Sequence, residues 1–418
     1  MKRESEMENV LTNKQKRSIE RSKTLFVVYM MLTITAYTLP MLKITLPYIA
    51  VAILLLSSIF FLALKNAKWL YYILILCLST LIVITIGMLT GVYGLVDAFN
   101  ELVRNVRFFL PFLWGSFVLK YCHKKHYKFI LVSFGLLCLV ILFQTLIALR
   151  EVPDICRELA KSTTRDSATL SNYRRKNVGG FEYSYMMGIV TLGFLWTMLK
   201  TSKKSVKVLC AVATIVCYYF IIQTMYTLLL ILTFVGTVAI FFFSTKNKFI
   251  KILLVIGVIL MFVLVEPMFK FLSEIFSFNY GLHEKFTNMY LALSYGDVDM
   301  VGSRPEMLLK GLSNWMRHPV FGGKAEASNT HSFIVSYLEN SGIIGVGVWL
   351  GFFAYNWTQL RKRLHHKSLF DATMIYMFLL ALFNPISFVF EIVFVSYLII
   401  PVWSEFVDLK LREKDEEF

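Results

Sequence analysis

Long apolar segments alternate with short polar ones along most of the chain. The stretches at 44–64 and 130–149 carry no Asp, Glu, Lys or Arg, and each has about the 20 residues that a helix needs to cross a bilayer. Similar stretches recur to the C-terminus, and no linker rich in Pro, Ser or Gly divides them. The pattern predicts an all-α, polytopic integral membrane protein that folds as a single domain over residues 1–418.

The apolar stretches fit about twelve transmembrane helices. The fourth is short, and the tenth is expected to break near residues 341–345. Two longer polar segments separate spans, at about 150–178 and at 266–332, and the second is the large loop between helices 9 and 10. The expected spans are 24–42, 44–64, 69–90, 107–120, 129–149, 180–199, 206–223, 226–243, 249–265, 333–359, 370–388 and 390–405.

Composition and charge support this assignment. The 418 residues are 57% hydrophobic with a mean hydropathy of +0.63, whereas soluble domains are about 45–50% apolar. The net charge of +16 is also typical of nucleic-acid binding. In a membrane protein, however, basic residues collect in the cytoplasmic connections. We therefore expect membrane lipid as a partner and no nucleic acid.

The distribution of Lys and Arg predicts the topology. Basic residues crowd the N-terminus before Leu25, and every second connection is then basic, through to the C-terminal tail. This alternation places both termini in the cytoplasm of a multi-pass protein of the bacterial cytoplasmic membrane. Of the six cysteines, only Cys156 is expected outside, so no external disulfide is predicted within the chain.

The external segment at 150–178 is an exception to the charge rule, because it is rich in Lys and Arg. Arg174 and Arg175 stand immediately before a span. A guanidinium group binds phosphate through a planar, bidentate fork, although a basic residue at this depth also snorkels to lipid headgroups. We expect one of the pair to contact an anionic ligand, and Arg175 lies nearer the membrane.

The large external loop contains a second candidate for anion binding, Arg304. Ser303 can cap a helix that begins here, and Pro305 suits its first turn. An Arg at a helix start opposes the helix dipole unless an anion is bound there, and the alternative is a surface residue without a ligand. The helix is predicted to be amphipathic and to lie on the membrane, with one apolar face formed by Met307, Leu308, Leu312 and Trp315.

His331 is the candidate general base, since the pKa of an unperturbed imidazole lies near neutrality. It precedes an apolar span at the outer membrane interface. The alternative interpretation is that His331 is a polar interface residue without a catalytic role. His318, His283 and Glu339 are weaker candidates; His318 precedes a Pro and is typical of a turn.

No metal site is predicted. Asp297 and Asp299 have the D-x-D spacing of metal-binding sugar-nucleotide enzymes, but two acids in a polar loop are common by chance. The sugar nucleotides that such enzymes use as donors are also absent from the external side of the membrane. The sequence has no Cys/His zinc spacing, no Walker loop and no G-x-S-x-G.

The layout resembles the superfamily of bacterial O-antigen ligases and polymerases, which includes the Wzy-type polysaccharide polymerases. The similar segments are "RRKNVGGFEYSYMMG" (174–188), "SRPEMLLKGLSNWMRHPVFGGK" (303–324) and "NTHSFIVSYLENSGIIG" (329–345). Ser332 stands where Asn is common in the family. In "QTMYTLLLILTFVG" (223–236), Met225 and Tyr226 replace a basic residue, which removes one cationic contact.

The resemblance implies glycosyl transfer from a glycan on undecaprenyl pyrophosphate, with inversion and without a metal, nucleotide or other cofactor. Arg175 and Arg304, with Arg174 beside them, would hold the pyrophosphate, and His331 would deprotonate the acceptor hydroxyl. The partners implied are lipid-linked glycan donor and acceptor, together with a chain-length regulator protein.

Two alternatives remain open. An O-antigen ligase uses the same donor chemistry but transfers the glycan to lipid A core or another acceptor. A transporter or flippase of the lipid-linked polysaccharide belongs to a different class, which usually places charges within its spans and shows repeated halves. The predicted spans carry few charges and no repeat is visible, so we expect an enzyme that polymerises the lipid-linked repeats.

Overall fold

The fold is helical throughout the part of the chain that the computed structural model describes. That part comprises residues 13–46, 78, 81, 84–85, 87–89, 91, 110–161, 166–278, 280–295, 304–323, 332–384 and 389–415. It is 87% helical and contains no strand, which confirms the all-α prediction. Most of the expected spans at 44–64 and 69–90 lies outside these ranges, so these two spans stay predictions.

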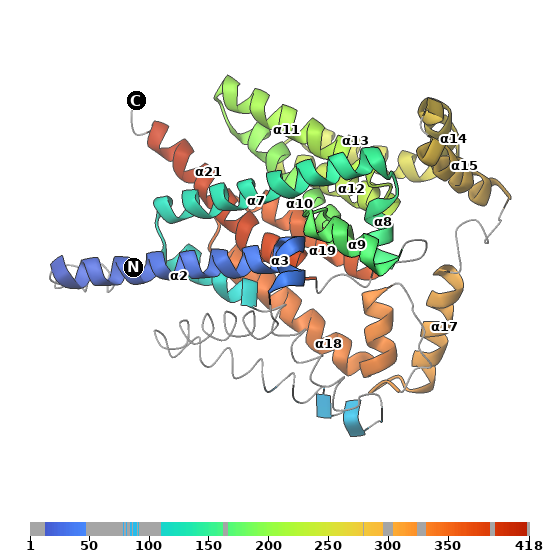
Figure 1. The fold of residues 1–418 in the computed structure, drawn as a ribbon, viewed down its shortest axis with the longest axis horizontal. Helices are drawn as coiled ribbons and strands as arrows, with labels where there is room; N and C mark the ends of the chain where they lie inside the picture. The colour runs from blue at the N-terminus through green and yellow to red at the C-terminus, as the bar shows by residue number, and fades with distance from the viewer. Residues whose placement is uncertain are drawn as a thin grey trace.

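Several described helices that are neighbours in the chain are joined by short connections, such as those between Phe181–Lys200, Lys204–Gln223 and Thr227–Ser244 (Figure 1). One further helix covers 110–121. The labelled elements are α2 (Asn13–Thr38), α3 (Pro40–Thr45), α7 (Lys124–Glu151), α8 (Ile155–Lys161), α9 (Ser167–Arg175), α10 (Phe181–Lys200), α11 (Lys204–Gln223), α12 (Thr227–Ser244), α13 (Lys248–Val263), α14 (Val265–Ile275), the 3-10 turn η1 (Phe276–Phe278), α15 (Tyr280–Tyr295), α17 (Arg304–Arg317), α18 (Phe333–Arg361), α19 (Ser368–Phe383), α20 (Phe390–Phe394), the π-helical turn η3 (Val395–Ile399) and α21 (Ile400–Asp415).

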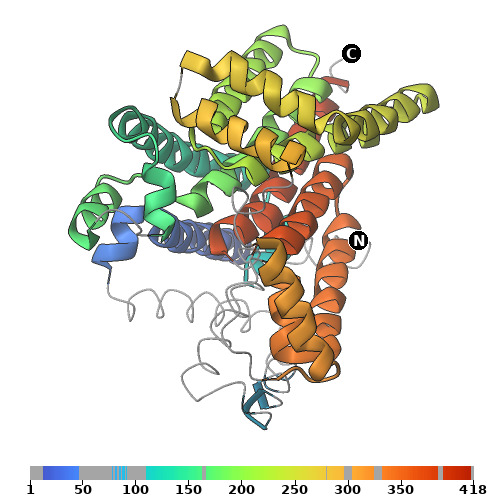
Figure 2. The same ribbon diagram turned by 90° about the vertical axis from the view of Figure 1, so that its right-hand side faces the viewer.

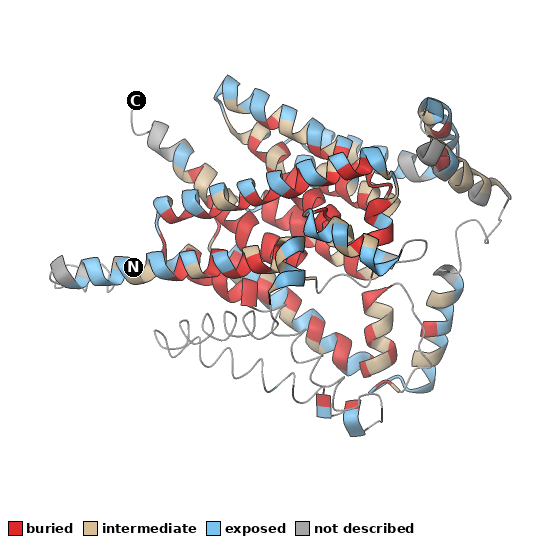
Figure 3. Cartoon of the chain, in the orientation of Figure 1, coloured by how far each residue is buried: buried red, intermediate tan, exposed pale blue. Residues whose placement is uncertain are grey.

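Five of the described helices are long and apolar enough to cross a membrane: Lys124–Glu151, Lys204–Gln223, Thr227–Ser244, Phe333–Arg361 and Phe390–Lys410. Figure 3 shows exposed residues along the outward faces of α7 and α11. Many of these are large and apolar, a surface that water would not tolerate and lipid would. Examples are Val132, Leu136, Phe143 and Ile147 on α7, and Val208, Leu209, Val212 and Ile215 on α11.

The centre of the bundle is formed by α10 and by the continuous helix α20–η3–α21. Met186, Ile189 and Trp196 of α10 are fully buried, as is Tyr397 in the π-helical turn. A side chain at Gly115, in the helix at 110–121, would place its Cβ 2.0 Å from the Tyr397 carbonyl oxygen. Glycine is therefore required there, because the two backbones touch at the π-helical turn.

The connections separate into two sides of the bundle. Figure 1 shows the start of α2 and the end of α21 on one side, which we call the terminal side. Helices α8, α9, α14, α15 and α17 lie at the other end, which we call the loop side. The described helices of the expected external segments at 150–178 and 266–332 therefore lie at the same end of the bundle, and their external location stays a prediction.

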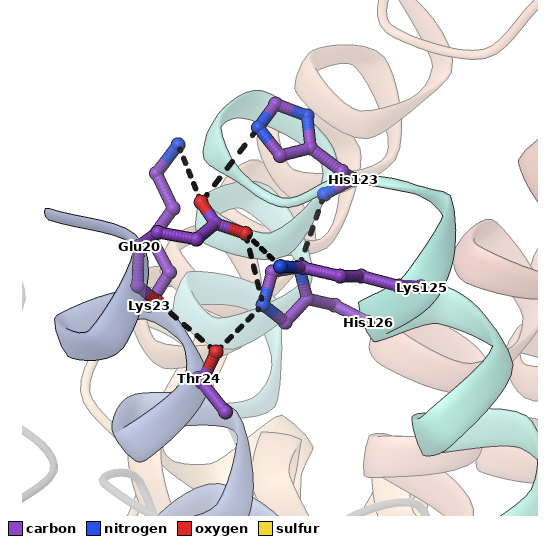
Figure 4. A network of polar contacts seen from close by, with 6 residues as sticks. All are labelled: Glu20, Lys23, Thr24, His123, Lys125 and His126. Carbon is purple, nitrogen blue, oxygen red and sulfur yellow. Dashed lines mark hydrogen bonds and ion pairs between the residues drawn. The ribbon is translucent and has the colours of Figure 1, made fainter. Parts of the chain in front are cut away.

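A polar network ties α2 to the start of α7 on the terminal side (Figure 4). Lys125 Nζ lies 2.6 Å from Glu20 Oε1, and the Thr24 hydroxyl lies 3.2 Å from His126 Nε2. The hydrogen bond from Lys125 lowers the pKa of the Glu20 carboxyl, despite the opposing effect of burial. The single carboxylate of this network therefore already has a lysine counter-charge.

Candidate functional site

Helix α18 is broken at Gly342, whose φ of 61° and ψ of −167° are not helical. Figure 1 shows the bend, which divides α18 into a short first half and a longer second half. The predicted break near residues 341–345 is therefore confirmed. A helix interrupted in this way leaves backbone groups without their usual i→i−4 partners.

The turn that follows α17 supplies partners for that break. The amides of Ile343 and Ile344 donate to the carbonyls of Pro319 and Val320, at 3.0 and 3.3 Å. The Gly323 amide donates to the carbonyl of Glu339 at 3.0 Å. The "HPVFGG" turn is thus bonded to the bend of α18, so two of the three segments on which the expected family resemblance depends contact each other.

Two glycines allow this close approach. Gly322 has a φ of +74°, and an added Cβ would lie 2.4 Å from the carbonyl carbon of Asn340. At Gly342 an added Cβ would lie 2.2 Å from the carbonyl oxygen of Val320. At both positions the positive φ favours glycine, and a backbone atom of the neighbouring segment occupies the space that a side chain would need.

A side-chain hydrogen bond joins the two helices further along. Asn314 Nδ2 of α17 donates to Glu339 Oε1 of α18 at 2.7 Å, and Glu339 is 3% exposed. Because α17 and the first half of α18 run side by side in the same direction (Figure 1), their first turns lie at the same end. At 1.5 Å per residue, Arg304 starts about 15 Å and Phe333 about 9 Å before this contact.

The predicted apolar face of α17 can be compared with the burial of its side chains. Met307, Leu308, Leu312 and Trp315 are half-buried. Leu309 and Met316 are largely exposed. The helix is therefore amphipathic with the predicted spacing, and its position on the membrane stays a prediction.

Arg304 is the first residue of α17, and Pro305 lies in the first turn as predicted; the Arg304 side chain lies outside the described part. His331, Asp297 and Asp299 also lie outside it. Ser332, which follows His331 in the chain, is the N-cap of α18, and its hydroxyl accepts a hydrogen bond from the Val335 amide at 3.3 Å. The predicted roles of Arg304 and His331 therefore stay predictions.

The structure distinguishes Arg174 from Arg175. Arg174 Nη2 donates to the carbonyl of Leu159 at 2.8 Å, near the end of α8, where helix carbonyls need partners. Both arginine side chains are exposed at the end of α9, so the contact with Leu159 is what distinguishes Arg174. Asn177, with a φ of 60°, accepts a hydrogen bond from the Met41 amide at 3.1 Å, so this segment is held against α3.

The two weaker histidine candidates take local structural positions. His283 Nδ1 lies 2.8 Å from the carbonyl oxygen of Ser273, which joins α15 to α14. His318 is exposed in the turn after α17, next to Gly323. Neither is brought near Arg175 by a described contact.

Met225 and Tyr226, which stand in place of the family's basic residue, hold two loop-side elements. Met225 is buried with Phe269 and Phe286 of the α14–α15 hairpin, which lies beside α11 and α12 in Figure 2. The Tyr226 hydroxyl donates to the carbonyl of Cys156 at 2.7 Å.

The sequence analysis missed an ion pair between Lys43 of α3 and Glu391 of α20. The Glu391 side chain is 5% exposed, whereas that of Lys43 is 39% exposed. Nearby, Asn384 Nδ2 donates to the Tyr185 hydroxyl at 3.3 Å. The sequence did contain a signal for this pair, since a Glu lies inside the expected span 390–405. Ionisable residues inside spans are usually functional or paired.

The chain is thus an α-helical, multi-pass membrane protein whose loop side carries a bonded pair of helices and an exposed arginine. No protein-family model matches the chain, and no curated protein matches it either.

Proposed function

We propose that this protein polymerises oligosaccharide repeats carried on undecaprenyl pyrophosphate, as the Wzy-type polymerases do, at the extracytoplasmic face of the bacterial cytoplasmic membrane. One observation carries the proposal: α17 and the first half of α18 are bonded side by side with their first turns at the same end. Of the residues that the family resemblance singles out, Arg304 is the first residue of α17, and His331 directly precedes Ser332, the N-cap of α18, in the sequence.

Two adjacent helix starts favour an anionic ligand. The first turns of α17 and α18 present backbone amides and the positive ends of two helix dipoles to the same region. A pyrophosphate placed there relieves the unfavourable position of Arg304 at a helix start. Arg175, exposed on the same loop side of the bundle, is the second proposed cation for the lipid-linked donor.

The reaction proposed is a single displacement at the anomeric carbon. His331 takes the proton of an acceptor hydroxyl as its oxygen bonds to that carbon, and the bond to the pyrophosphate oxygen breaks. Undecaprenyl pyrophosphate leaves with the electron pair, and Arg304 and Arg175 stabilise its charge. The products are a longer lipid-linked glycan, inverted at the new linkage, and free undecaprenyl pyrophosphate.

Glu339 acts in this scheme as a positioning residue. Its buried carboxylate accepts from Asn314, so it holds α17 against α18. Glu339→Gln keeps an acceptor oxygen at this position and is expected to retain polymer formation, whereas Glu339→Ala is expected to lose both stability and turnover. Loss of turnover in Glu339→Gln with an unchanged melting temperature would assign the carboxylate a chemical role instead.

The decisive experiment is reconstitution of the purified protein with a defined lipid-pyrophosphate glycan, followed by gel analysis of the products. His331→Ala should still bind the donor and lose polymer formation by about 10²–10⁴-fold, the usual effect of removing a general base. Arg304→Ala and Arg175→Ala should lose both donor affinity and rate. Arg304→Lys should recover only part, because an ammonium lacks the bidentate fork.

Matched controls separate these effects from general loss of charge. Lys310→Ala removes an exposed cation from the same helix as Arg304, and Lys176→Ala removes one beside Arg175. Both controls should keep donor binding and turnover. Normal turnover in His331→Ala, or equal losses in Lys310→Ala and Arg304→Ala, would refute the proposed roles.

The choice of polymerase over ligase rests on the acceptor. The same assay with only lipid-linked repeats yields a ladder of products if the protein is a polymerase. A ligase produces no ladder and needs lipid A core or another distinct acceptor, so a product that forms only when such an acceptor is added would reassign the activity.

A transporter of the lipid-linked glycan is the second candidate, and the Lys43–Glu391 pair favours it. Glu391 lies within the apolar helix Phe390–Lys410, which also contains a π-helical turn, and transporters place charges and helix irregularities at their substrate sites. Translocation of a labelled lipid-linked repeat across proteoliposomes, without any longer product, would support this candidate over the polymerase.

A further inference from the structure

Two buried carboxylates meet two histidines on the terminal side of the bundle. Glu405 and Asp408 lie three residues apart on α21, on one helical face, and are 7% and 5% exposed. His365 and His366 lie in the connection between α18 and α19. The cluster is outside the loop-side region assigned to glycosyl transfer.

The contacts in the cluster are short and involve both oxygens of each acid. His365 Nδ1 lies 2.9 Å from Glu405 Oε2 and 3.7 Å from Asp408 Oδ2. His366 Nε2 lies 3.1 Å from Asp408 Oδ1. Two further hydrogen bonds hold the α18–α19 connection against α21. The His365 amide donates to Glu405 Oε1 at 2.8 Å, and the Ser404 hydroxyl donates to the His366 carbonyl at 2.8 Å.

The electrostatics of the cluster require a cation. Two carboxylates removed from water so close together are costly unless positive charge compensates them. The network around Glu20 has one carboxylate and an ammonium group, Lys125, at 2.6 Å. The groups that contact Glu405 and Asp408 include the imidazoles of His365 and His366, and imidazole is the commonest metal ligand in proteins.

We propose that His365 Nδ1, Glu405 and Asp408 bind a divalent transition-metal ion, with Zn²⁺ the best-matched probe. One donor atom from each residue lies within 4.8 Å of the others. Ligands that share a tetrahedral Zn²⁺ at about 2.0–2.2 Å lie about 3.4 Å apart, and the observed contacts of 2.9 and 3.7 Å bracket that value. An imidazole with two carboxylates is a donor set suited to Zn²⁺ or Mn²⁺.

His366 would then orient a ligand, because its Nε2 contacts the second oxygen of Asp408. The imidazole of His365 is 51% exposed, which gives an ion a path to the buried carboxylates. The bound ion would clamp the α18–α19 connection to the C-terminal helix. This role is structural and is independent of the glycosyl transfer proposed for the loop side.

The test uses full-length protein without a polyhistidine tag, purified in detergent, treated with chelator and titrated with Zn²⁺. One equivalent per chain should bind, and Co²⁺ in its place should give the visible absorption of a site with nitrogen and oxygen ligands. Glu405→Gln should raise the Kd tenfold or more while keeping an acceptor for the His365 amide. Because the His365 side chain is half-exposed, His365→Ala provides a second variant that should fold.

The matched control is Glu20→Gln, which changes the other His/carboxylate network on the terminal side (Figure 4) and should leave the Kd unchanged. Zn²⁺ should raise the melting temperature of the wild type and of Glu20→Gln by a few degrees, and that of Glu405→Gln by less than one. Absence of a one-equivalent site, or equal Zn²⁺ affinity in wild type and His365→Ala, would overturn the proposal.

Discussion

Replacing Gly342 by Ala tests how the bend of α18 is held against the turn after α17. The new Cβ would lie 2.2 Å from the Val320 carbonyl oxygen and 2.5 Å from the Phe321 nitrogen, so the turn must move. A non-glycine residue in this backbone conformation costs about 1–3 kcal/mol. The hydrogen bonds of Ile343 and Ile344 to the turn contribute about 0.5–1.5 kcal/mol each.

The expected loss is therefore about 2–6 kcal/mol of local stability, concentrated in the contact between the turn and the bend. Hydrogen exchange measured by mass spectrometry reads this directly, because the amides of Ile343 and Ile344 lose their acceptors. A loss of 2 kcal/mol corresponds to exchange about 30-fold faster. In the reconstituted assay, Gly342→Ala should also lose turnover, since α17 is no longer held in register with α18.

The matched control is Gly347→Ala, one turn and a half further along the same helix. A Cβ at Gly347 meets nothing within 4 Å, and alanine is favoured over glycine in a helix interior by up to about 1 kcal/mol. This variant should exchange at the wild-type rate or more slowly. If Gly342→Ala and Gly347→Ala show the same exchange rates, the bend does not depend on glycine and the reasoning fails.

Three further predictions follow from the burial and charge of particular residues. A cysteine at the exposed position Ala168 on α9 should react with a membrane-impermeant maleimide in intact spheroplasts. A cysteine at Ser202, exposed between α10 and α11, should react only after lysis. The reverse result would invert the predicted topology. Burial raises the pKa of the Cys156 thiol to about 12, so about 10⁻⁴ of it is thiolate at pH 8, and labelling of Cys156 at the rate of Ala168→Cys would contradict its burial. Lys43→Ala leaves the Glu391 carboxylate without its partner and should destabilise the protein by about 2 kcal/mol. This is less than the 3–5 kcal/mol lost when a fully buried pair is broken. The double variant Lys43→Ala, Glu391→Gln should regain most of the lost melting temperature.

The sequence by itself determined the fold class and the positions of most described helices. Apolar runs of about 20 residues can satisfy their backbone groups in a bilayer only as helices, so their ends were predicted to within a few residues, as at Phe181–Lys200 and Thr227–Ser244. The break in α18 was also local, since Ser and Gly in the run at 341–345 interrupt helical packing. These features depend on neighbours along the chain.

Only the tertiary structure decided which segments meet. Arg174 and Arg175 are equivalent in the sequence and both are exposed, yet it is Arg174 that donates to the carbonyl of Leu159. Asn314 and Glu339 are 25 residues apart, and His365 and Glu405 are 40 apart. Such pairs are selected by how helices pack and by the cost of leaving a buried polar group without a partner, which no local pattern of hydrophobic and polar residues contains.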